Sequence, residues 1–178
     1  FPGIALDNPI GQPTTLSGAQ FLAEVDPYQF QWWVLDYVGG RPQGEKKKGA
    51  DGGIDGRAFF PDPAEGDVKE IIFSVKSGAV GPDHVTSFGR RIDKEGAIIG
   101  VIIMLREPTR TMKKDALECG WYTHPVTNER YQKLQIITVE QLLDGVIVNR
   151  PYANSPTTTF RKAPKLKRPS TQLKMEEA

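Results

Sequence analysis

The sequence predicts an α/β domain with a mixed central sheet of four or five strands flanked by helices. Three observations support this fold class. First, an apolar stripe with helical spacing follows Asp26-Pro27. Second, an apolar run over residues 97–105 is typical of a strand covered on both faces. Third, helical and strand patterns alternate as far as residue 145. A chain of 178 residues is long enough for one such domain with its own core.

The first predicted helix has a clear start. Asp26 is a good N-cap and Pro27 suits the first helical position, and Gly39-Gly40 ends the segment. Trp33 belongs to the apolar stripe of this helix, whereas Trp32 does not, so we expect Trp32 to pack against a neighbour or a partner.

The rest of the domain follows from periodicity and turn signals. A glycine-rich run over 49–56 leads into a strand at 57–60, and a turn-rich stretch separates it from a second strand at 70–76, which together predict a β-hairpin. The later predicted elements are a helix at 82–95, a strand at 97–105, a helix at 109–118, a strand at 134–137 and a short helix that starts with a capping box at 138–141.

Both ends of the chain differ in composition from this core. Residues 1–15 are rich in Pro and Gly and are predicted to be a linker, residues 16–148 form the domain, and residues 149–178 are predicted to be a flexible basic tail. The tail has six Lys or Arg and two Glu from residue 160 onward. The chain begins with Phe1, so we expect it to be part of a longer protein.

Composition excludes several classes of function. The 23 Lys and Arg nearly balance the 22 Asp and Glu, so no strong overall field attracts nucleic acid or a membrane. The longest apolar run has nine residues, too few to cross a bilayer, so we expect a soluble protein with no membrane partner. A single cysteine, Cys119, excludes an internal disulfide and fits a cytoplasmic setting.

Lys76 lies at a position that indicates a functional role. Ile72, Ser74 and Lys76 share one face of the predicted strand, and Lys76 ends it. An ammonium beside apolar residues needs an anion, and Asp55 on the preceding strand is the natural candidate. The pair is either a structural ion pair or a phosphodiester-cleaving pair, in which the acid binds a divalent metal and the lysine positions water.

The same residues resemble a known family. The run Lys48-Gly49-Ala50-Asp51-Gly52-Gly53-Ile54-Asp55-Gly56, followed by Phe73-Ser74-Val75-Lys76, is similar to the signature of Mrr-type restriction endonucleases in the PD-(D/E)xK superfamily. The resemblance covers about residues 20–145 and extends to endonuclease-like domains appended to site-specific DNA methyltransferases. It implies a restriction-endonuclease-like fold and a Mg²⁺-dependent DNA endonuclease of a restriction–modification or DNA-defence system, with Mn²⁺ as a substitute.

The resemblance also implies the roles of individual residues. Asp55 corresponds to the metal-binding aspartate, Lys76 to the catalytic lysine, and the main-chain carbonyl of Val75 to a further metal ligand. Ser74 stands at the ligand position where the family has Glu or Gln, and Gln31 stands where many relatives have Glu. Two neutral ligands should weaken Mg²⁺ binding. Asp51 is a further candidate ligand.

Because Ser74 and Gln31 are neutral, more than one function agrees with the sequence. The domain is either an active endonuclease or a catalytically weakened nuclease fold that serves as a DNA-binding or assembly module of a DNA methyltransferase. A third reading is an enzyme of the same fold that acts on RNA. For double-stranded DNA, the expected phosphate contacts are Lys46, Lys47, Lys48, Ser77, Arg90 and Arg91. A methyltransferase module on the same longer chain and a homodimer are further hypotheses, and His84 is expected at the surface.

Overall fold

The computed structural model describes residues 12–43, 53–62 and 66–151. The helices are α1 (Leu16–Val25), α2 (Pro27–Tyr37), α3 (Pro82–Glu95), α4 (Arg110–Glu118) and α5 (Val139–Leu143). The strands are β1 (Arg41–Pro42), β2 (Gly56–Pro61), β3 (Val68–Lys76), β4 (Ile99–Met104), β5 (Trp121–Thr123), β6 (Arg130–Gln132) and β7 (Leu134–Thr138).

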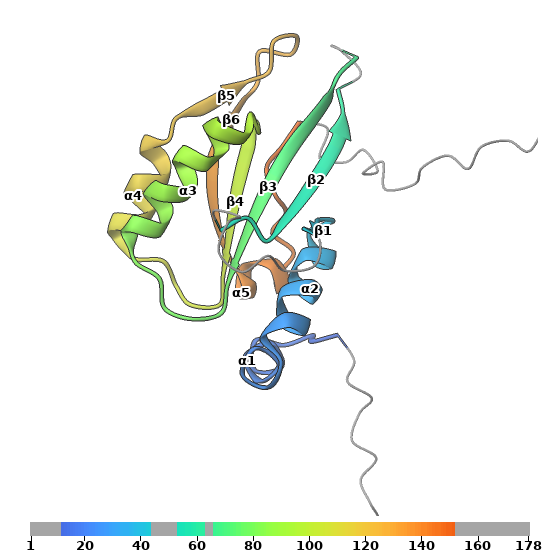
Figure 1. Cartoon of the computed structure of the whole chain (residues 1–178), viewed down its shortest axis with the longest axis vertical. Coiled ribbons are helices and arrows are strands. Elements are labelled where there is room, and N and C mark those ends of the chain that lie inside the picture. The colour runs from blue at the N-terminus through green and yellow to red at the C-terminus, as the bar shows by residue number, and fades with distance from the viewer. Residues whose placement is uncertain (1–11, 44–52, 63–65, 152–178) are drawn as a thin grey trace, which may run out of the picture.

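Five of these strands form one mixed sheet in the order β1-β2-β3-β4-β7 (Figure 1). β2 and β3 are the predicted antiparallel hairpin, whereas β4 runs parallel to both β3 and β7. The predicted fold class is therefore confirmed. β4 begins two residues later than predicted, because Gly96 at φ 72° and the Ala97 N–H, which donates to the carbonyl of Ile92, complete the end of α3.

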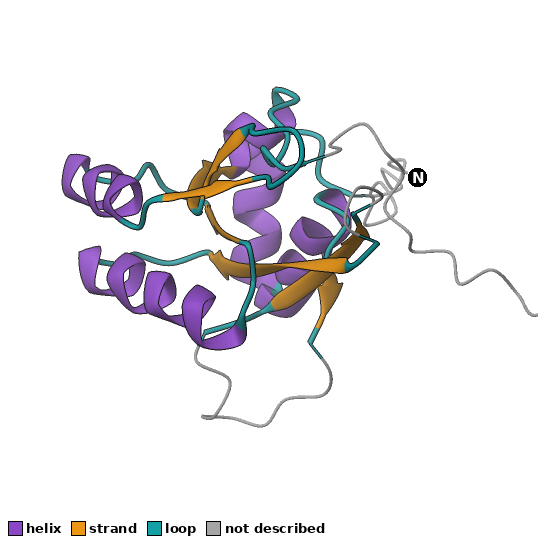
Figure 2. Cartoon of the chain, turned by 90° about the horizontal axis from the view of Figure 1, so that it is seen from above, coloured by secondary structure: helices purple, strands orange, loops and turns teal. Residues whose placement is uncertain are grey.

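Helices cover both faces of the sheet (Figure 2). On one face α1, α2 and α5 pack on a core that includes Phe73 and Val75, and on the other α3 and α4 pack on a core that includes Ile72 and Ile102. Every residue of β4 is buried, as expected for a strand covered on both sides. In the part of the chain that the structure describes, no helix has the length and apolar character needed to cross a membrane.

Helix α1 was not predicted from the sequence. Thr15 caps this helix by accepting a hydrogen bond from the Gly18 N–H at 3.1 Å. The α1 segment contains a glycine and only two buried residues, Ala19 and Ala23, so its apolar stripe is weak. Asp26 ends α1 and also caps α2, since its carboxylate accepts from the N–H groups of Tyr28 and Gln29 at 3.1 Å each. One residue therefore fixes the corner between the two helices.

Packing brings α2 close to the start of β2. A side-chain Cβ at Gly56 would lie 2.5 Å from Cδ2 of Leu35, closer than two carbon atoms can approach. The absence of a side chain at Gly56 therefore lets Leu35 sit against the first residue of β2. As predicted, Trp33 is buried. Trp32 is 52% exposed, so no neighbour buries it as expected, and packing against a partner stays a prediction.

The outer strand β7 carries a polar side chain that binds the chain's later segment. The Gln135 amide donates to the Asn149 carbonyl at 2.6 Å and accepts from the Asn149 N–H at 3.0 Å. The short β5–β6 hairpin, which the sequence analysis also missed, forms a separate two-stranded sheet. The predicted capping box of α5 is confirmed at Thr138 and Gln141.

Candidate functional site

The backbone places Asp55 opposite the end of β3. The Asp55 N–H donates to the carbonyl of Phe73 at 2.8 Å, and β2 pairs with β3 from Gly56 opposite Phe73 onward. Continuing this register sets Asp55 across from Ser74, and residues directly opposite share a face of the sheet. The side chain of Asp55 therefore lies on the α3 face, together with those of Ser74 and Lys76.

The predicted pairing of Asp55 with Lys76 is confirmed. The Lys76 ammonium lies 3.3 Å from Oδ2 of Asp55, and the two side chains are 23% and 21% exposed. The same carboxylate oxygen also accepts from the Val75 N–H at 2.7 Å and from the Ser74 hydroxyl at 3.3 Å. Three donors thus converge on one oxygen of Asp55, at a place that solvent reaches in part.

His84, in the first turn of α3, extends this cluster. Its Nε2 lies 3.2 Å from the buried hydroxyl of Ser74, which itself donates to Asp55. A hydroxyl has one proton to give, so the Nε2–H of His84 is the donor to Ser74. The expectation that His84 lies at the surface is wrong: it is half-buried and stacks on Phe88 with the ring centroids 6.2 Å apart.

Burial controls the charge of His84. Removal from solvent lowers the pKa of the imidazole below its ordinary value, the Lys76 ammonium lowers it further, and the Asp55 carboxylate acts in the opposite direction. His84 is therefore neutral near pH 7, which agrees with its role as a single donor to Ser74. The contact between His84 and Ser74 could have been predicted only if the path of the turn between β3 and α3 had been known.

The described residues offer a magnesium ion few charged ligands. Mg²⁺ requires several oxygen ligands in near-octahedral geometry. Across residues 12–43, 53–62 and 66–151, no group of three or more His, Cys, Asp or Glu side chains could hold a metal. Asp55 uses Oδ2 for three donors, one of them an ammonium, and the Ser74 hydroxyl is already engaged. Asp51, the further candidate, lies outside the described residues.

Two of the expected metal ligands stay predictions. Gln31 is half-buried on α2, one turn before Leu35, and α2 packs on the sheet face opposite Ser74. The N–H of Val75 serves Asp55, while its side chain is buried in the core beneath α1 and α2. Neither observation tests whether Gln31 or the Val75 carbonyl binds a cation.

The residues expected to contact DNA do not lie together in the part of the chain that the structure describes. Lys46, Lys47 and Lys48 lie outside the described residues. Arg90 is exposed on α3, whereas Arg91 lies 3.5 Å from the Glu95 carboxylate, which also binds Arg57 at 2.7 Å. A groove of about 420 Å³ at the carboxyl ends of β3 and β4 contains Ser77 and is lined by Gln20, Ala23, Glu24, Ser77, Gly78, Leu105 and Arg106.

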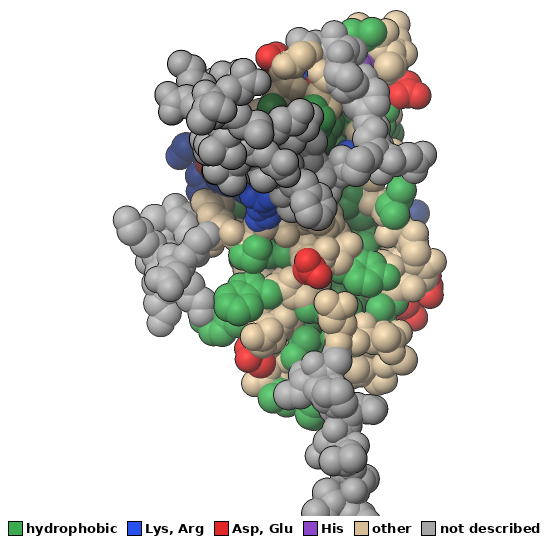
Figure 3. All heavy atoms as spheres, turned by 90° about the vertical axis from the view of Figure 1, so that its right-hand side faces the viewer, with side chains coloured by type: hydrophobic (Ala, Val, Ile, Leu, Met, Phe, Trp, Pro, Cys, Tyr) green, Lys and Arg blue, Asp and Glu red, His purple; other side chains and the backbone are tan. Residues whose placement is uncertain are grey.

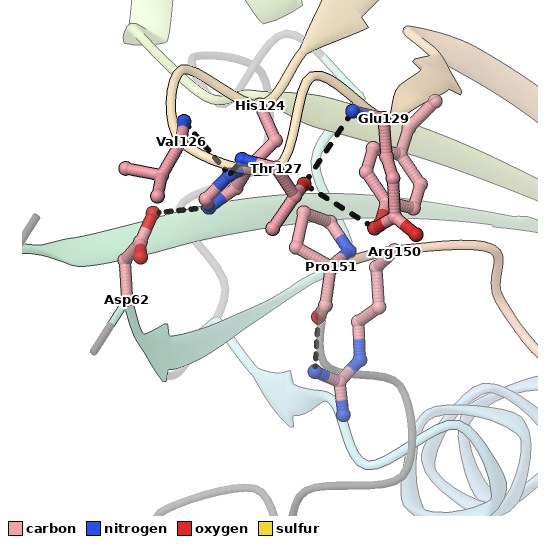
Figure 4. Close-up of polar contacts among 8 residues, drawn as sticks. Asp62, His124, Val126, Thr127, Glu129, Arg150 and Pro151 are labelled. Atoms are coloured by element: carbon pink, nitrogen blue, oxygen red, sulfur yellow. Dashed lines mark hydrogen bonds and ion pairs between the residues drawn. The ribbon is translucent and has the colours of Figure 1, made fainter. Parts of the chain in front are cut away.

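A second polar cluster lies far from Asp55. His124 and Asp62 are fully buried, with Nε2 of His124 2.9 Å from Oδ2 of Asp62 (Figure 4). Nδ1 of His124 accepts from the N–H groups of Val126 and Thr127 at 3.3 and 3.0 Å, so Nε2 carries the proton and donates to Asp62. The pair joins the β5–β6 hairpin to the residue after β2. Its burial marks it as a structural contact, and the sequence analysis missed it because its two residues are 62 positions apart.

The mixed sheet, with an aspartate and a lysine meeting where β2 begins and β3 ends, defines the class of this protein as a restriction-endonuclease-like domain. The family model described as NACHT-associated inactive Restriction Endonuclease 1 matches residues 27–144. The chain belongs to this family, and the expected restriction-endonuclease resemblance is confirmed.

One solved structure supports the fold, and a second is reported beside it. The DNA modification-dependent restriction endonuclease AspBHI has a TM-score of 0.52 and 14% identity, over 80% of this chain and 38% of that chain. The MspJI restriction endonuclease, in complex with a 27-mer oligonucleotide, has a TM-score of 0.49 and 17% identity, over 79% of this chain and 34% of that chain. This chain thus spans less than half of either enzyme. No curated protein matches it.

Proposed function

We propose that this domain binds duplex DNA at the Asp55–Lys76 end of its sheet without hydrolysing it. One observation carries the proposal: Oδ2 of Asp55 is held by Val75, Ser74 and Lys76, and among the described residues it belongs to no group of three or more His, Cys, Asp or Glu side chains that could hold a metal. The family's description as inactive supports this reading.

The chemistry of the cluster favours binding over cleavage. Hydrolysis of a phosphodiester needs an activated water and stabilisation of the charge that develops on the phosphorus oxygens. The donors on Asp55 stabilise its carboxylate in place of a metal cation, and the Nε2–H of His84 donates a hydrogen bond to Ser74. The ammonium of Lys76 has three donors and uses one on Asp55, so it can still contact a phosphate.

An exposed basic residue near this end of the sheet supports DNA binding. Arg106 follows β4 and lines the groove that contains Ser77, whereas Arg90 lies on α3 beside Glu118 and Lys133. Such contacts to phosphates supply affinity without sequence preference.

A second candidate is the metal-dependent endonuclease that the resemblance to Mrr-type enzymes implies. The convergence of Asp55 and Lys76 at 3.3 Å, with about a fifth of each side chain exposed, favours it. Mg²⁺ or Mn²⁺ as cofactor, association with a DNA methyltransferase and homodimerisation stay predictions linked to this candidate.

One experiment separates the two functions. Plasmid DNA is incubated with the wild type, Asp55→Ala and Lys76→Ala in the presence of Mg²⁺ or Mn²⁺, and binding to a short duplex is followed by gel shift. We expect no nicking by any of the three proteins and a shift by the wild type. Nicking by the wild type, absent in both variants, would establish the endonuclease instead.

The binding surface is mapped with a matched control. Lys76→Ala and Arg106→Ala should each weaken the shift and lower the slope of log affinity against log salt by about one phosphate contact. Lys114→Ala removes an exposed cation from α4, where it lies 3.6 Å from Glu118, and should leave the shift unchanged. Equal effects of all three variants would contradict binding at the Asp55–Lys76 end.

A further inference from the structure

A polar groove begins one residue beyond Lys76, between α1 and the carboxyl ends of β3 and β4. It is lined by residues of α1 and by residues that follow the two strands: Gln20, Ala23, Glu24, Ser77, Gly78, Leu105 and Arg106. Its volume of about 420 Å³ lies in the range of small-molecule sites, roughly 300–1,000 Å³. We call it the strand-end groove.

The backbone fixes the strand side of the strand-end groove. The Leu105 N–H donates to the Lys76 carbonyl at 3.0 Å, which extends the parallel pairing of β3 with β4 beyond the last residues of the two strands. Neighbouring strands lie about 5 Å apart, so Ser77 and Arg106 follow two adjacent strand ends. A ligand in this groove would therefore lie next to the cluster of Asp55 and Lys76.

The fold does not use the polar side chains of the strand-end groove. Among the residues that the structure describes, no hydrogen bond or ion pair joins another protein group to these side chains, which are those of Gln20, Glu24, Ser77 and Arg106. Glu107, by contrast, follows Arg106 directly and lies 3.7 Å from the ammonium of Lys113. The donors and acceptors that line the groove are thus left for a ligand.

The two sides of the strand-end groove differ in charge. Gln20 and Glu24 are one helical turn apart on the α1 side. The segment from Leu16 to Tyr37 contains no Lys or Arg, and in the lower part of Figure 3 hydrophobic and acidic side chains lie over α1 and α2, with no basic ones visible in that view. Arg106 is exposed on the strand side. A suitable ligand therefore places an anionic group beside Arg106 and hydrogen-bond donors beside Glu24.

A guanine nucleotide has this arrangement of groups. The N1–H and N2–H of guanine are neighbouring donors that suit the two oxygens of the Glu24 carboxylate, and guanine O6 can accept from the Gln20 amide. The phosphate suits Arg106, and the apolar side chains of Ala23 and Leu105 can contact the face of the base. Thymine, by contrast, has a single N–H between two carbonyl oxygens, which a carboxylate repels.

This edge of guanine is free only outside a base pair, because pairing in a duplex uses the same N–H groups. We infer that the strand-end groove binds a guanine nucleotide whose base is unpaired, with Glu24 and Gln20 on the base and Arg106 on the phosphate. The inference rests on the proposed DNA binding only for the source of the nucleotide, which is either an unpaired position in DNA or a free nucleotide.

The test compares DNA duplexes that differ in one nucleotide, with the full chain as the protein. One labelled duplex carries a single unpaired deoxyguanosine. Matched duplexes carry an unpaired deoxyinosine, which lacks the 2-amino group, or an unpaired thymidine, and a fourth is fully paired. Fluorescence anisotropy measures the affinity for each. We expect the deoxyguanosine duplex to bind about tenfold more tightly than the thymidine duplex, with the deoxyinosine duplex between them.

Two variants of exposed acids locate the contact. Glu24→Ala removes the acceptor of the base and should abolish the preference for deoxyguanosine over thymidine. Glu107→Ala removes an equal charge just beyond Arg106 and should preserve that preference. Both variants change the net charge alike, so the ratio of the two affinities separates the base contact from general attraction to DNA. Circular dichroism confirms that both variants are folded.

A second arm uses free nucleotides and identifies the source of the ligand. Deoxyguanosine monophosphate and thymidine monophosphate are titrated into the wild type and Glu24→Ala by calorimetry. A guanine preference that depends on Glu24 supports the inference in either arm. Its presence with the free nucleotides alone would assign the groove to a free nucleotide, and its presence with the duplexes would assign it to DNA.

Two results would overturn the inference. The first is equal affinity for the guanine and thymine probes in both arms, and the second is a guanine preference that Glu24→Ala leaves intact. Failure of the proposed DNA binding is a different result, because it appears as an absence of binding to the fully paired duplex. The titration with free nucleotides then still decides whether the groove binds guanine.

Discussion

The imidazole of His84 and the hydroxyl of Ser74 are joined by a contact of 3.2 Å, which links the first turn of α3 to the end of β3. The same hydroxyl donates to Asp55 at 3.3 Å. Ser74, which the resemblance to Mrr-type enzymes predicts to stand at a metal-ligand position, thus joins a helix to the Asp55 carboxylate.

This contact predicts a pH dependence of folding. The pKa of His84 is lowered in the folded state, first by burial and then by Lys76, so the unfolded chain binds more protons near the ordinary pKa of 6.5. The contribution of His84 to stability is therefore complete above that value and decreases as the pH falls through it. Urea unfolding between pH 8 and 5 should show a smaller decrease for His84→Gln than for the wild type. Identical pH profiles would contradict the contact.

Ser74→Glu tests the position of the missing metal ligand. A second carboxylate beside Asp55 should strengthen Mg²⁺ binding, because affinity for a hard cation increases with the number of charged oxygen ligands. Isothermal titration calorimetry should show tighter binding for Ser74→Glu than for the wild type. Ser77→Glu, just beyond the end of β3, is the control and should change little. Unchanged Mg²⁺ affinity in a folded Ser74→Glu protein would argue against the placement of Ser74 as a ligand position.

The buried pair of His124 and Asp62 should dominate the stability of the β5–β6 hairpin. Asp62→Ala leaves the Nε2–H of His124 without its acceptor and should lower the free energy of unfolding by about 3 kcal/mol, whereas Asp62→Asn keeps an acceptor oxygen and should lower it less. Asp93→Ala, which removes a largely exposed partner of Lys133, should lower it by less than about 1 kcal/mol. Chemical denaturation measures all three, and equal losses would refute the role of burial.

Gly56 offers a test of the packing beside Asp55. A methyl group there would meet Cδ2 of Leu35 at 2.5 Å and the Arg41 carbonyl at 3.0 Å, so Gly56→Ala should lower the free energy of unfolding by about 1–3 kcal/mol. Gly78→Ala places its methyl group in open space and should be nearly neutral. Thermal unfolding that does not distinguish the two variants would contradict the close approach of α2.

Local signals made much of this fold predictable. Asp26-Pro27 marks the start of α2 through capping alone, and the two strands of the β2–β3 hairpin show β-branched and aromatic residues on either side of a turn. The pairing of Asp55 with Lys76 followed from the alternation of side chains along β3 and from the cost of an unpaired ammonium.

Apart from α1, the features that were missed depend on contacts between separate segments. Strands β5 and β6 have three residues each, too few for a periodic pattern, and are held by the contact between His124 and Asp62. His84 reaches Ser74 only because the turn after Lys76 returns the chain onto the sheet, and no residue pattern specifies the path of that turn. Sequence periodicity describes one element at a time and does not contain such information.

The side chain of Gln135 holds the Asn149 peptide as a neighbouring strand would, with one hydrogen bond in each direction. Asn149 itself lies in no helix or strand. Its amide proton should nevertheless exchange slowly in deuterated solvent, on the timescale of the central sheet, because release requires Gln135 to leave its buried site.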